Sequence, residues 1–307
     1  MTVALDDLII KYMTRNLQSN LTAWILIFPF VFFFSVFLIY PFAYTVIHSF
    51  TDSPLIGWGN WVGLENYVKI LKDKLFAKSI YQTFIFVAWT VIPNTIIGLM
   101  IALMIHRINS AIYASVVLAC FFIPHILPVT VVTELWKSMT SNELGVIQWI
   151  VVIFQDEPIP FFRHKIWSMP SVALITIWWT VGFNVLLFLA GLKMINPEIY
   201  EASQIDGANI FHQFRFITWP LIWPITALVL TLQLIFQLKI FDQMFLLTGG
   251  GPYNKTMVVL YHVYKQSFMM NKGGYASAIA LIIFLFIIFV SVANYFILRA
   301  VDLDKQK

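Results

Sequence analysis

The side chains whose type and spacing could do chemistry in this 307-residue chain are uncharged amides and hydroxyls within long apolar stretches. Thr226, Gln233 and Gln237 are spaced seven and four residues apart, so on a helix they share one face within about 40°. Asn184 and Asn94 are two further amides in the middle of apolar runs. Such groups can hydrogen-bond a neutral polyol, or they can join neighbouring helices. We predict that Asn184, Gln233 and Gln237 line a substrate pathway, with packing between helices as the alternative.

Other familiar chemistries do not fit the sequence. No Ser/His/Asp set has the context of a nucleophile, and the lone Cys120 reads as a small buried hydrophobe. The segment 249–256, GGGPYNKT, resembles a phosphate-binding loop, but Asn254 stands where that loop needs glycine before its lysine. We therefore expect no enzymatic activity, no ATPase site, no metal and no cofactor. The histidines, which lack metal-ligand spacing, are His48, His106, His125, His164, His212 and His262.

The composition is that of an integral membrane protein. Hydrophobic residues make up 60% of the chain and charged residues 11%, with a mean hydropathy of +0.82, whereas soluble domains carry about 25% charged residues. The net charge of +4 comes from basic residues scattered through loops, which form no patch for nucleic acid. Membrane lipid is therefore an expected partner and nucleic acid is not.

Long apolar runs predict an all-α protein with six transmembrane helices, because a lipid-exposed backbone must satisfy its own hydrogen bonds. We expect an N-terminal segment at 1–20, a membrane domain at 21–298 and a C-terminal tail at 299–307. Leu144 to Phe154 is too short to span and is expected on or dipping into the membrane surface. Pro124 and Pro128 are expected to kink the third span. The spans are 21–47, 79–105, 112–136, 169–192, 220–247 and 276–298.

The lysines and arginines of the loops do not fix the orientation. With the N-terminus inside, eight fall in inner segments and ten in outer loops and their margins, while Lys239 lies within the fifth span. The positive-inside rule therefore does not decide between the two orientations.

The segment 196–220, between the fourth and fifth spans, predicts two short helices joined at a glycine. Asn196 can cap the first helix, Pro197 suits its first position, and Glu198 lies where the helix dipole favours a carboxylate. Gly207 suits the positive φ that often ends a helix, and a second helix can start at Asn209. Such an elbow is stiff enough to transmit a push from a partner.

The same segment resembles the EAA loop of ABC importer permeases, with the pattern E-A-A-x-x-D-G-A, eight residues, then I-x-L-P. Ser203 and Trp219 depart from the pattern without changing the helix–turn–helix logic. The resemblance implies a type I importer fold in which loop 193–219 is cytoplasmic and docks on an ATPase subunit. It also implies that both termini are cytoplasmic and that loops 48–78, 137–168 and 248–275 lie outside. The matching residues are Glu201, Ala202, Asp206, Gly207, Ala208, Ile217 and Pro220.

Phe241-Asp242 followed by residues 247–252, LTGGGP, resembles the sugar-importer permeases of the maltose type, in the subunit that carries this segment. Residues 63–67, GLENY, are similar to the same subfamily. The resemblance implies a sugar or sugar-like solute, a second homologous permease subunit, two ATP-binding ATPase subunits and an extracytoplasmic solute-binding protein. It places the chain in a bacterial or archaeal inner membrane.

Two rival classes are weighed against this interpretation. An ion-coupled secondary transporter needs carboxylates within the membrane, and Asp242 is the one acidic residue near it. A membrane-embedded enzyme needs a polar catalytic cluster, which the spans do not offer. We expect Asp242 to pair with Lys239, three residues away, in a structural role.

Overall fold

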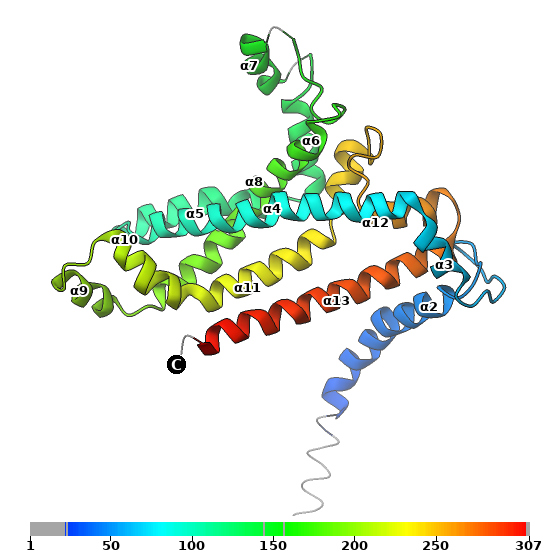
Figure 1. Ribbon diagram of the computed structural model, residues 1–307, viewed down its shortest axis with the longest axis horizontal. Helices are drawn as coiled ribbons and strands as arrows, with labels where there is room; N and C mark the ends of the chain where they lie inside the picture. The colour runs from blue at the N-terminus through cyan, green and yellow to red at the C-terminus, as the bar shows by residue number, and fades with distance from the viewer. Residues whose placement is uncertain (1–21, 23, 144, 156, 305–307) are drawn as a thin grey trace, which may run out of the picture.

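The computed structural model describes residues 22, 24–143, 145–155 and 157–304, and Figure 1 shows their helices. Five helices of the described part are long and apolar enough to cross a membrane, and a sharply bent helix pair makes a sixth span if it counts as one. Extended pairing in this part is limited to one isolated bridge between Thr51 and Trp61. The predicted N-terminal segment 1–20 lies outside the described residues.

The first span diverges from the other helices. It runs from Trp24 to His48 and includes a π-helical turn, Ser35–Ile39, followed by α2, Tyr40–His48. Its most apolar window has no buried residue, and the helix it packs against most is the last one, α13 (Gly273–Asp304). Figure 1 shows α2 leaving the bundle at the end where α3 (Glu65–Lys72) lies. Helix α13 continues past the predicted end of the sixth span at residue 298.

The centre of the fold is the packing of α4 (Lys74–His106) against α8 (Ser168–Lys193), with α5 (Ala111–Ile126) on the other side of α8. Two glycines allow this close approach. A Cβ at Gly98 on α4 would lie 2.8 Å from the Cβ of Asn184, and one at Gly182 would collide with the carbonyl of Phe121 on α5. Larger residues there would force the helices apart.

The third span, predicted for 112–136 with a kink at its prolines, is indeed kinked, and the bend is sharp. Helix α5 ends at Ile126, and α6 (Val129–Met139) leaves at an angle of 98°. Pro128 explains the break, because the residue before a proline avoids the helical region, and Leu127 is extended with ψ 138°. Cys120 on α5 is exposed, so the expectation of a buried thiol was wrong.

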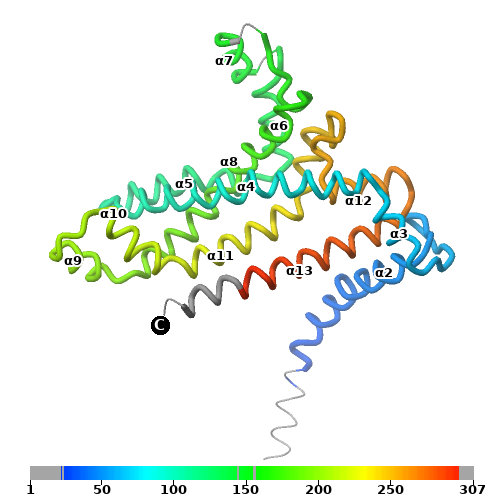
Figure 2. The backbone as a smooth tube through the Cα atoms, in the orientation of Figure 1, coloured from blue at the N-terminus to red at the C-terminus, as the bar shows by residue number. Residues whose placement is uncertain are grey.

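Helix α7 (Val146–Gln155) coincides with the short apolar run predicted as a surface helix, although Leu144 itself lies outside the described residues. Together α6 and α7 form an arm that projects from the side of the bundle (Figures 1 and 2). The chain returns from this arm into α8.

The fifth span has about the predicted length but is shifted toward the N-terminus of the chain. Apolar helix runs from Ile210 to Leu238 through α10 (Ile210–Gln213), a π-helical turn and α11 (Trp219–Leu238). It stops nine residues before the predicted end at 247, at the break that holds Lys239 and precedes Asp242. A π-helical turn, Met244–Thr248, and α12 (Val259–Tyr264) follow. Figure 2 shows α9 (Pro197–Ile205) and α3 at opposite ends of the molecule.

Candidate functional site

Four buried amides from three helices meet at the centre of the fold. Gln233 of α11 donates to Asn184 Oδ1 on α8 at 2.8 Å, and its own Oε1 accepts from Asn94 Nδ2 on α4 at 3.2 Å. Gln237 Nε2, one turn further along α11, donates to Gln233 Oε1 at 3.2 Å. None of these side chains is more than 3% exposed. We call Asn94, Asn184, Gln233 and Gln237 the amide cluster.

The amide cluster joins the helices as well as presenting polar groups. Asn94 Nδ2 also donates to Thr180 Oγ1 on α8 at 2.8 Å, and Asn184 Nδ2 donates to the Asn94 carbonyl at 3.3 Å. Pro93 directly precedes Asn94 within α4. Thr226, the third member of the predicted polar face, instead donates to the Ile222 carbonyl of its own helix. The helix-joining role that the sequence left open is therefore present in the geometry.

A cavity of about 400 Å³ opens beside the cluster. Its volume lies in the range of small-molecule sites, which combine aromatic walls with a few convergent polar groups. Of the three residues predicted for a substrate pathway, Gln233 and Gln237 line this cavity, and Asn184 lies behind Gln233. The lining residues are His125, Thr176, Trp179, Thr180, Phe183, Gln233, Phe236, Gln237, Lys239, Ile240, Phe241, Asp242 and Gln243.

The aromatic wall of the cavity was missed by the sequence analysis. Trp179 and Phe183 come from α8, and the His125 ring stacks on Phe183 with the ring centroids 5.3 Å apart. The Trp179 indole nitrogen donates to the Leu127 carbonyl at 3.2 Å, so the break between α5 and α6 helps to hold this ring. Thr176, Trp179 and Phe183 recur at three- and four-residue spacing, which is the signal that could have placed them on one face.

Lys239 and Asp242 line the same cavity, and both are exposed. The expected structural pairing is not seen, because the ion pairs of the described residues do not include one between them. Lys239 lies in the break after α11, and Asp242 begins the helical segment that follows it, so both charged side chains are part of the cavity wall. Both charges are therefore available to whatever enters.

The elbow at 196–220 has the predicted local structure. Asn196 Oδ1 accepts from the Glu198 amide at 3.1 Å and caps α9, and Asn209 Oδ1 caps α10 through the His212 amide at 2.9 Å. Gly207 has φ 80°, and the Gly207 and Ala208 amides donate to the carbonyls of Gln204 and Ser203. This pair of bonds is the Schellman ending of a helix, which needs a residue that tolerates positive φ.

Side chains stiffen the elbow further. Gln213 Nε2 donates to Ser203 Oγ at 3.0 Å, and the hydroxyls of Tyr200 and Thr218 lie 2.9 Å apart. Ser203, which departs from the family pattern, therefore holds α9 against the segment that leads into α11. These bonds connect the two short helices to each other and to the start of that span.

The outer surface of the elbow is open and partly apolar. Among the residues predicted for ATPase coupling, Glu201, Ala202, Asp206 and Gly207 are exposed and Ala208 is half-buried. Ile205 is 87% exposed, and α9 has no buried residue. Further apolar side chains exposed nearby are Met194, Ile210, Phe211 and Phe216. A cluster of exposed apolar residues on a stiff helix is typical of a protein-binding surface.

Within the described residues, no group of three or more His, Cys, Asp or Glu side chains could hold a metal ion. The polar groups at the centre are amides, hydroxyls and aromatic rings, arranged around a cavity between apolar helices. Such a site can bind and pass a solute through hydrogen bonds and ring contacts. Fold and site together define a multi-pass membrane transport protein.

Comparisons with known proteins identify the family. Residues 94–303 match the family described as binding-protein-dependent transport system inner membrane component. The trehalose/maltose transport system permease protein MalF of Thermococcus litoralis is 31% identical over 90% of this chain and 95% of that protein. The arabinooligosaccharides transport system permease protein AraP of Bacillus subtilis is 29% identical over 87% and 85%. The chain therefore belongs to the family of binding-protein-dependent transport system inner membrane components.

The fold agrees with this family. The crystal structure of a bacterial ABC transporter involved in the import of the acidic polysaccharide alginate superposes with a TM-score of 0.84, at 21% identity over 94% of this chain and 98% of the other. The predicted all-α importer permease fold is confirmed, as is the resemblance to maltose-type permeases.

Family membership settles the class of protein. The chain is a multi-pass inner-membrane permease subunit of an ABC importer, and ATP hydrolysis takes place on separate partner subunits. Its partners are those of the family: a second permease subunit, ATPase subunits and a solute-binding protein. The comparisons give no support to the ion-coupled alternative.

Proposed function

We propose that this permease carries a sugar or sugar-like solute through the cavity beside the amide cluster. The observation that supports this most is the cavity lining, in which the rings of Trp179, Phe183 and Phe236 face the same space as the amides of Gln233 and Gln237. Sugars present apolar ring faces and hydroxyl edges, so they need both kinds of wall. Two relatives are named for sugars, trehalose/maltose and arabinooligosaccharides, which is in line with this lining.

The three pathway amides have different parts in this proposal. Gln237 contacts the solute, because its amide makes one hydrogen bond, as a donor to Gln233, and its carbonyl oxygen is free for a hydroxyl. Gln233 presents its edge to the cavity while bonded to three other amides. Asn184 holds Gln233 in place from behind.

We propose that α9 docks on an ATPase subunit through Glu201, Ala202, Asp206, Gly207 and Ala208. The capped, Schellman-terminated helix and its exposed apolar side chains support this role. Closure of the ATPase pair then moves α9, and the bonds from Ser203 and Thr218 carry the motion into α11. Because α11 holds Gln233 and Gln237, the push reaches the cavity along one helix.

In this proposal the α9 end is cytoplasmic, with both termini inside, the segment 1–20 at the N-terminus and 299–307 at the C-terminus. Loops 48–78, 137–168 and 248–275 then lie outside. The arrangement in Figure 1 supports it, because α13 ends on the side of α9 while α3 lies at the opposite end. The membrane domain is 21–298, with the coupling loop at 193–219.

The test is uptake by the reconstituted complex with its binding protein and labelled maltose or arabinooligosaccharide. Gln237→Ala and Trp179→Ala should lower transport per assembled complex about tenfold, while basal ATP hydrolysis and assembly stay normal. Thr226→Ala is the matched control, because Thr226 is equally buried on the same face of α11 but bonds only its own helix. Reduced assembly with unchanged transport per complex would refute the cavity's role.

A further inference from the structure

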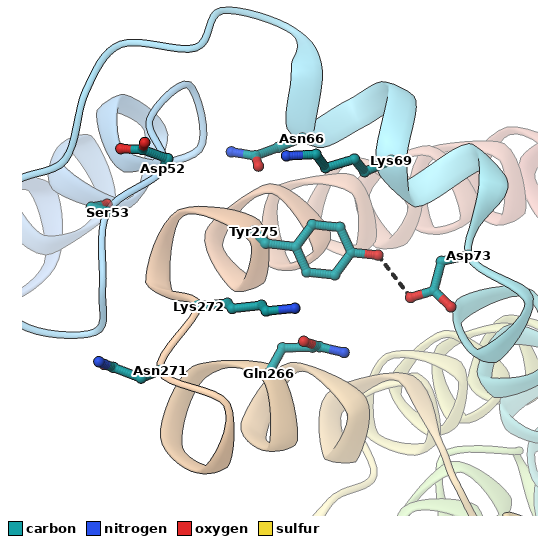
Figure 3. A pocket seen from close by; sticks show the side chains of 9 residues that line it. All are labelled: Asp52, Ser53, Asn66, Lys69, Asp73, Gln266, Asn271, Lys272 and Tyr275. Atoms are coloured by element: carbon teal, nitrogen blue, oxygen red, sulfur yellow. Dashed lines mark hydrogen bonds between the residues drawn. The ribbon is translucent and has the colours of Figure 1, made fainter.

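Two further cavities lie near α4 and α13, one where these helices begin and one further along them. The first, of about 410 Å³, is polar and lies near the α3 end, where Figure 3 shows Lys69, Asp73, Lys272 and Tyr275 around it. The second, of about 110 Å³, is lined almost wholly by apolar side chains, among them Ile80 and Ile282. Neither cavity is used by the proposed transport site.

Helical register places the two cavities on one line. On α13, Tyr275 lines the first cavity and Ile282 and Phe286 line the second, and spacings of seven and eleven residues keep all three within about 40°. On α4, the cap residue Asp73 stands above Ile80 and Phe84 at the same spacings. The Tyr275 hydroxyl donates to Asp73 Oδ2 at 2.7 Å. This bond joins the beginnings of the two helices at the wall of the polar cavity.

The depth of the two cavities matches the layers of a membrane. Seven residues of helix separate Tyr275 from Ile282, which is about 10 Å. The headgroup layer on each side of a bilayer is roughly 5–8 Å thick. The apolar cavity begins within the hydrophobic stretch of both spans, so the polar one lies at headgroup level.

The charges of the polar cavity leave a cationic group without a partner. Asp73 is already bonded by Tyr275, His262 and the amides of Leu75 and Phe76. Lys69 pairs with Glu65 at 2.8 Å, but both side chains are more than half exposed, and such a pair contributes little. Lys272 is in no ion pair with another described residue. Asp52 is a second carboxylate on the cavity wall; it accepts a hydrogen bond from the Asn60 amide, and Figure 3 shows it turned away from Lys69 and Lys272. An anionic group placed beside the two lysines would therefore gain Lys272 and compete for Lys69.

We propose that the two cavities together bind one membrane phospholipid, with its phosphate at Lys272 and Lys69 and one acyl chain along Ile80, Ile282 and Phe286. The apolar cavity is also lined by Leu238, the last residue of α11, and by Val259 of α12. Leu238 directly precedes the break that holds Lys239 at the transport cavity. A bound chain therefore touches the end of the helix that the elbow drives, and its occupancy steadies that end.

The test is native mass spectrometry of the purified complex in nanodiscs of phosphatidylglycerol and phosphatidylethanolamine. The wild-type complex should retain one tightly bound phospholipid. In the Lys272→Glu variant, the fraction of complexes that retain this phospholipid should be about fivefold lower. Lys165→Ala is the control, because Lys165 is also an exposed lysine but lies on the loop before α8. Inorganic phosphate at millimolar concentration should not displace the lipid. Binding of inorganic phosphate by a wild-type complex that retains no phospholipid at this site would show an ion site and refute the lipid.

A photoreactive phenylalanine analogue at Phe84 separates a lipid from a protein occupant. Phe84 lines the groove and contacts Phe286 edge-on, with the ring centroids 5.6 Å apart. Illumination should add the mass of a phospholipid to this chain. A covalent product with the second permease subunit would overturn the proposal, and so would equal lipid retention in wild type and Lys272→Glu.

Discussion

The amide cluster and the α9 elbow are the two polar regions to which we assign roles in transport, and they are built in opposite ways. The amides are almost wholly buried, and their hydrogen bonds run mostly between helices. The elbow is exposed, and its hydrogen bonds stay within twenty residues of chain. A buried amide stripped of its partner costs about 1–3 kcal/mol, whereas an exposed residue of the elbow can change with little cost to the fold.

The difference teaches which variants report on folding and which on function. Changes at the centre of the cluster should act first on stability, because several helices share each bond. Changes on the elbow should act on coupling while the membrane bundle stays intact. Gln237, at the edge of the cluster, lies between these two cases.

The largest effect is expected from Gly207→Pro. Proline fixes φ near −65° and has no amide hydrogen, whereas Gly207 needs φ 80° and donates to the Gln204 carbonyl. We expect normal membrane insertion and a more than tenfold loss of uptake and of substrate-stimulated ATP hydrolysis. Gly63→Pro is the matched control, because Gly63 also has positive φ in an open loop but lies at the opposite end. Equal loss of uptake in both variants would show that the α9 end is no more important for coupling than the α3 end.

Asn184→Ala should have a smaller effect, and it should act on stability and not on coupling. It removes the acceptor of Gln233 Nε2 in a site that is 1–2% exposed. We expect the unfolding free energy to fall by about 1–3 kcal/mol, read as a lower midpoint in thermal unfolding of the detergent-solubilised complex. Transport per assembled complex should change less than in Gln237→Ala. The reverse order would mean that Asn184 contacts the solute directly.

The smallest effect is a pH dependence at the α3 end. Burial lowers the pKa of His262 by more than the nearby Asp73 carboxylate raises it, and Lys265 also lowers it. Burial raises the pKa of Asp73, but hydrogen bonds from Tyr275 and from the Phe76 and Leu75 amides lower it by more. The net pKa of Asp73 is therefore below its ordinary value. His262 is therefore neutral when folded, and its stabilising contribution is present above its ordinary pKa of about 6.5.

The same contribution is lost as the pH falls below that value, because the unfolded chain then binds a proton that the folded chain does not. Asp73 stays ionised in this window. Thermal unfolding between pH 7.5 and 5.5 should show the midpoint of the wild type falling more steeply than that of His262→Gln, whose amide can still donate to Asp73. Parallel curves would rule out His262 as the titrating group.

Much of this fold follows from the sequence, and the misses have physical causes. Long apolar runs fix the number of spans, and the caps at Asn196 and Asn209 with glycine at 207 fix the elbow, because these are local effects. A kink at the proline at 128 was expected, but its size of 98° was not, because hydropathy alone treats this proline as part of a span. The break at Lys239 was missed in the same way.

The candidate site was only half visible in the sequence. Amides within apolar runs stand out, so Gln233 and Gln237 could be found from their spacing. Trp179 and Phe183 could not be separated from ordinary lipid-facing or core aromatics, since their role depends on how α8 is rotated against α5. That rotation is set by close contacts such as Gly182 against Phe121, which are long-range.

The central claim is that an ATPase subunit pushes on the exposed side of α9. A photoreactive residue at Ile205, which is 87% exposed, tests it directly in the intact complex. The same probe at Trp58, 67% exposed near α3, is the control for the opposite end. We predict a covalent product with the ATPase subunit from position 205 and none from position 58. A product with the ATPase from position 58, or with the solute-binding protein from position 205, would contradict the account.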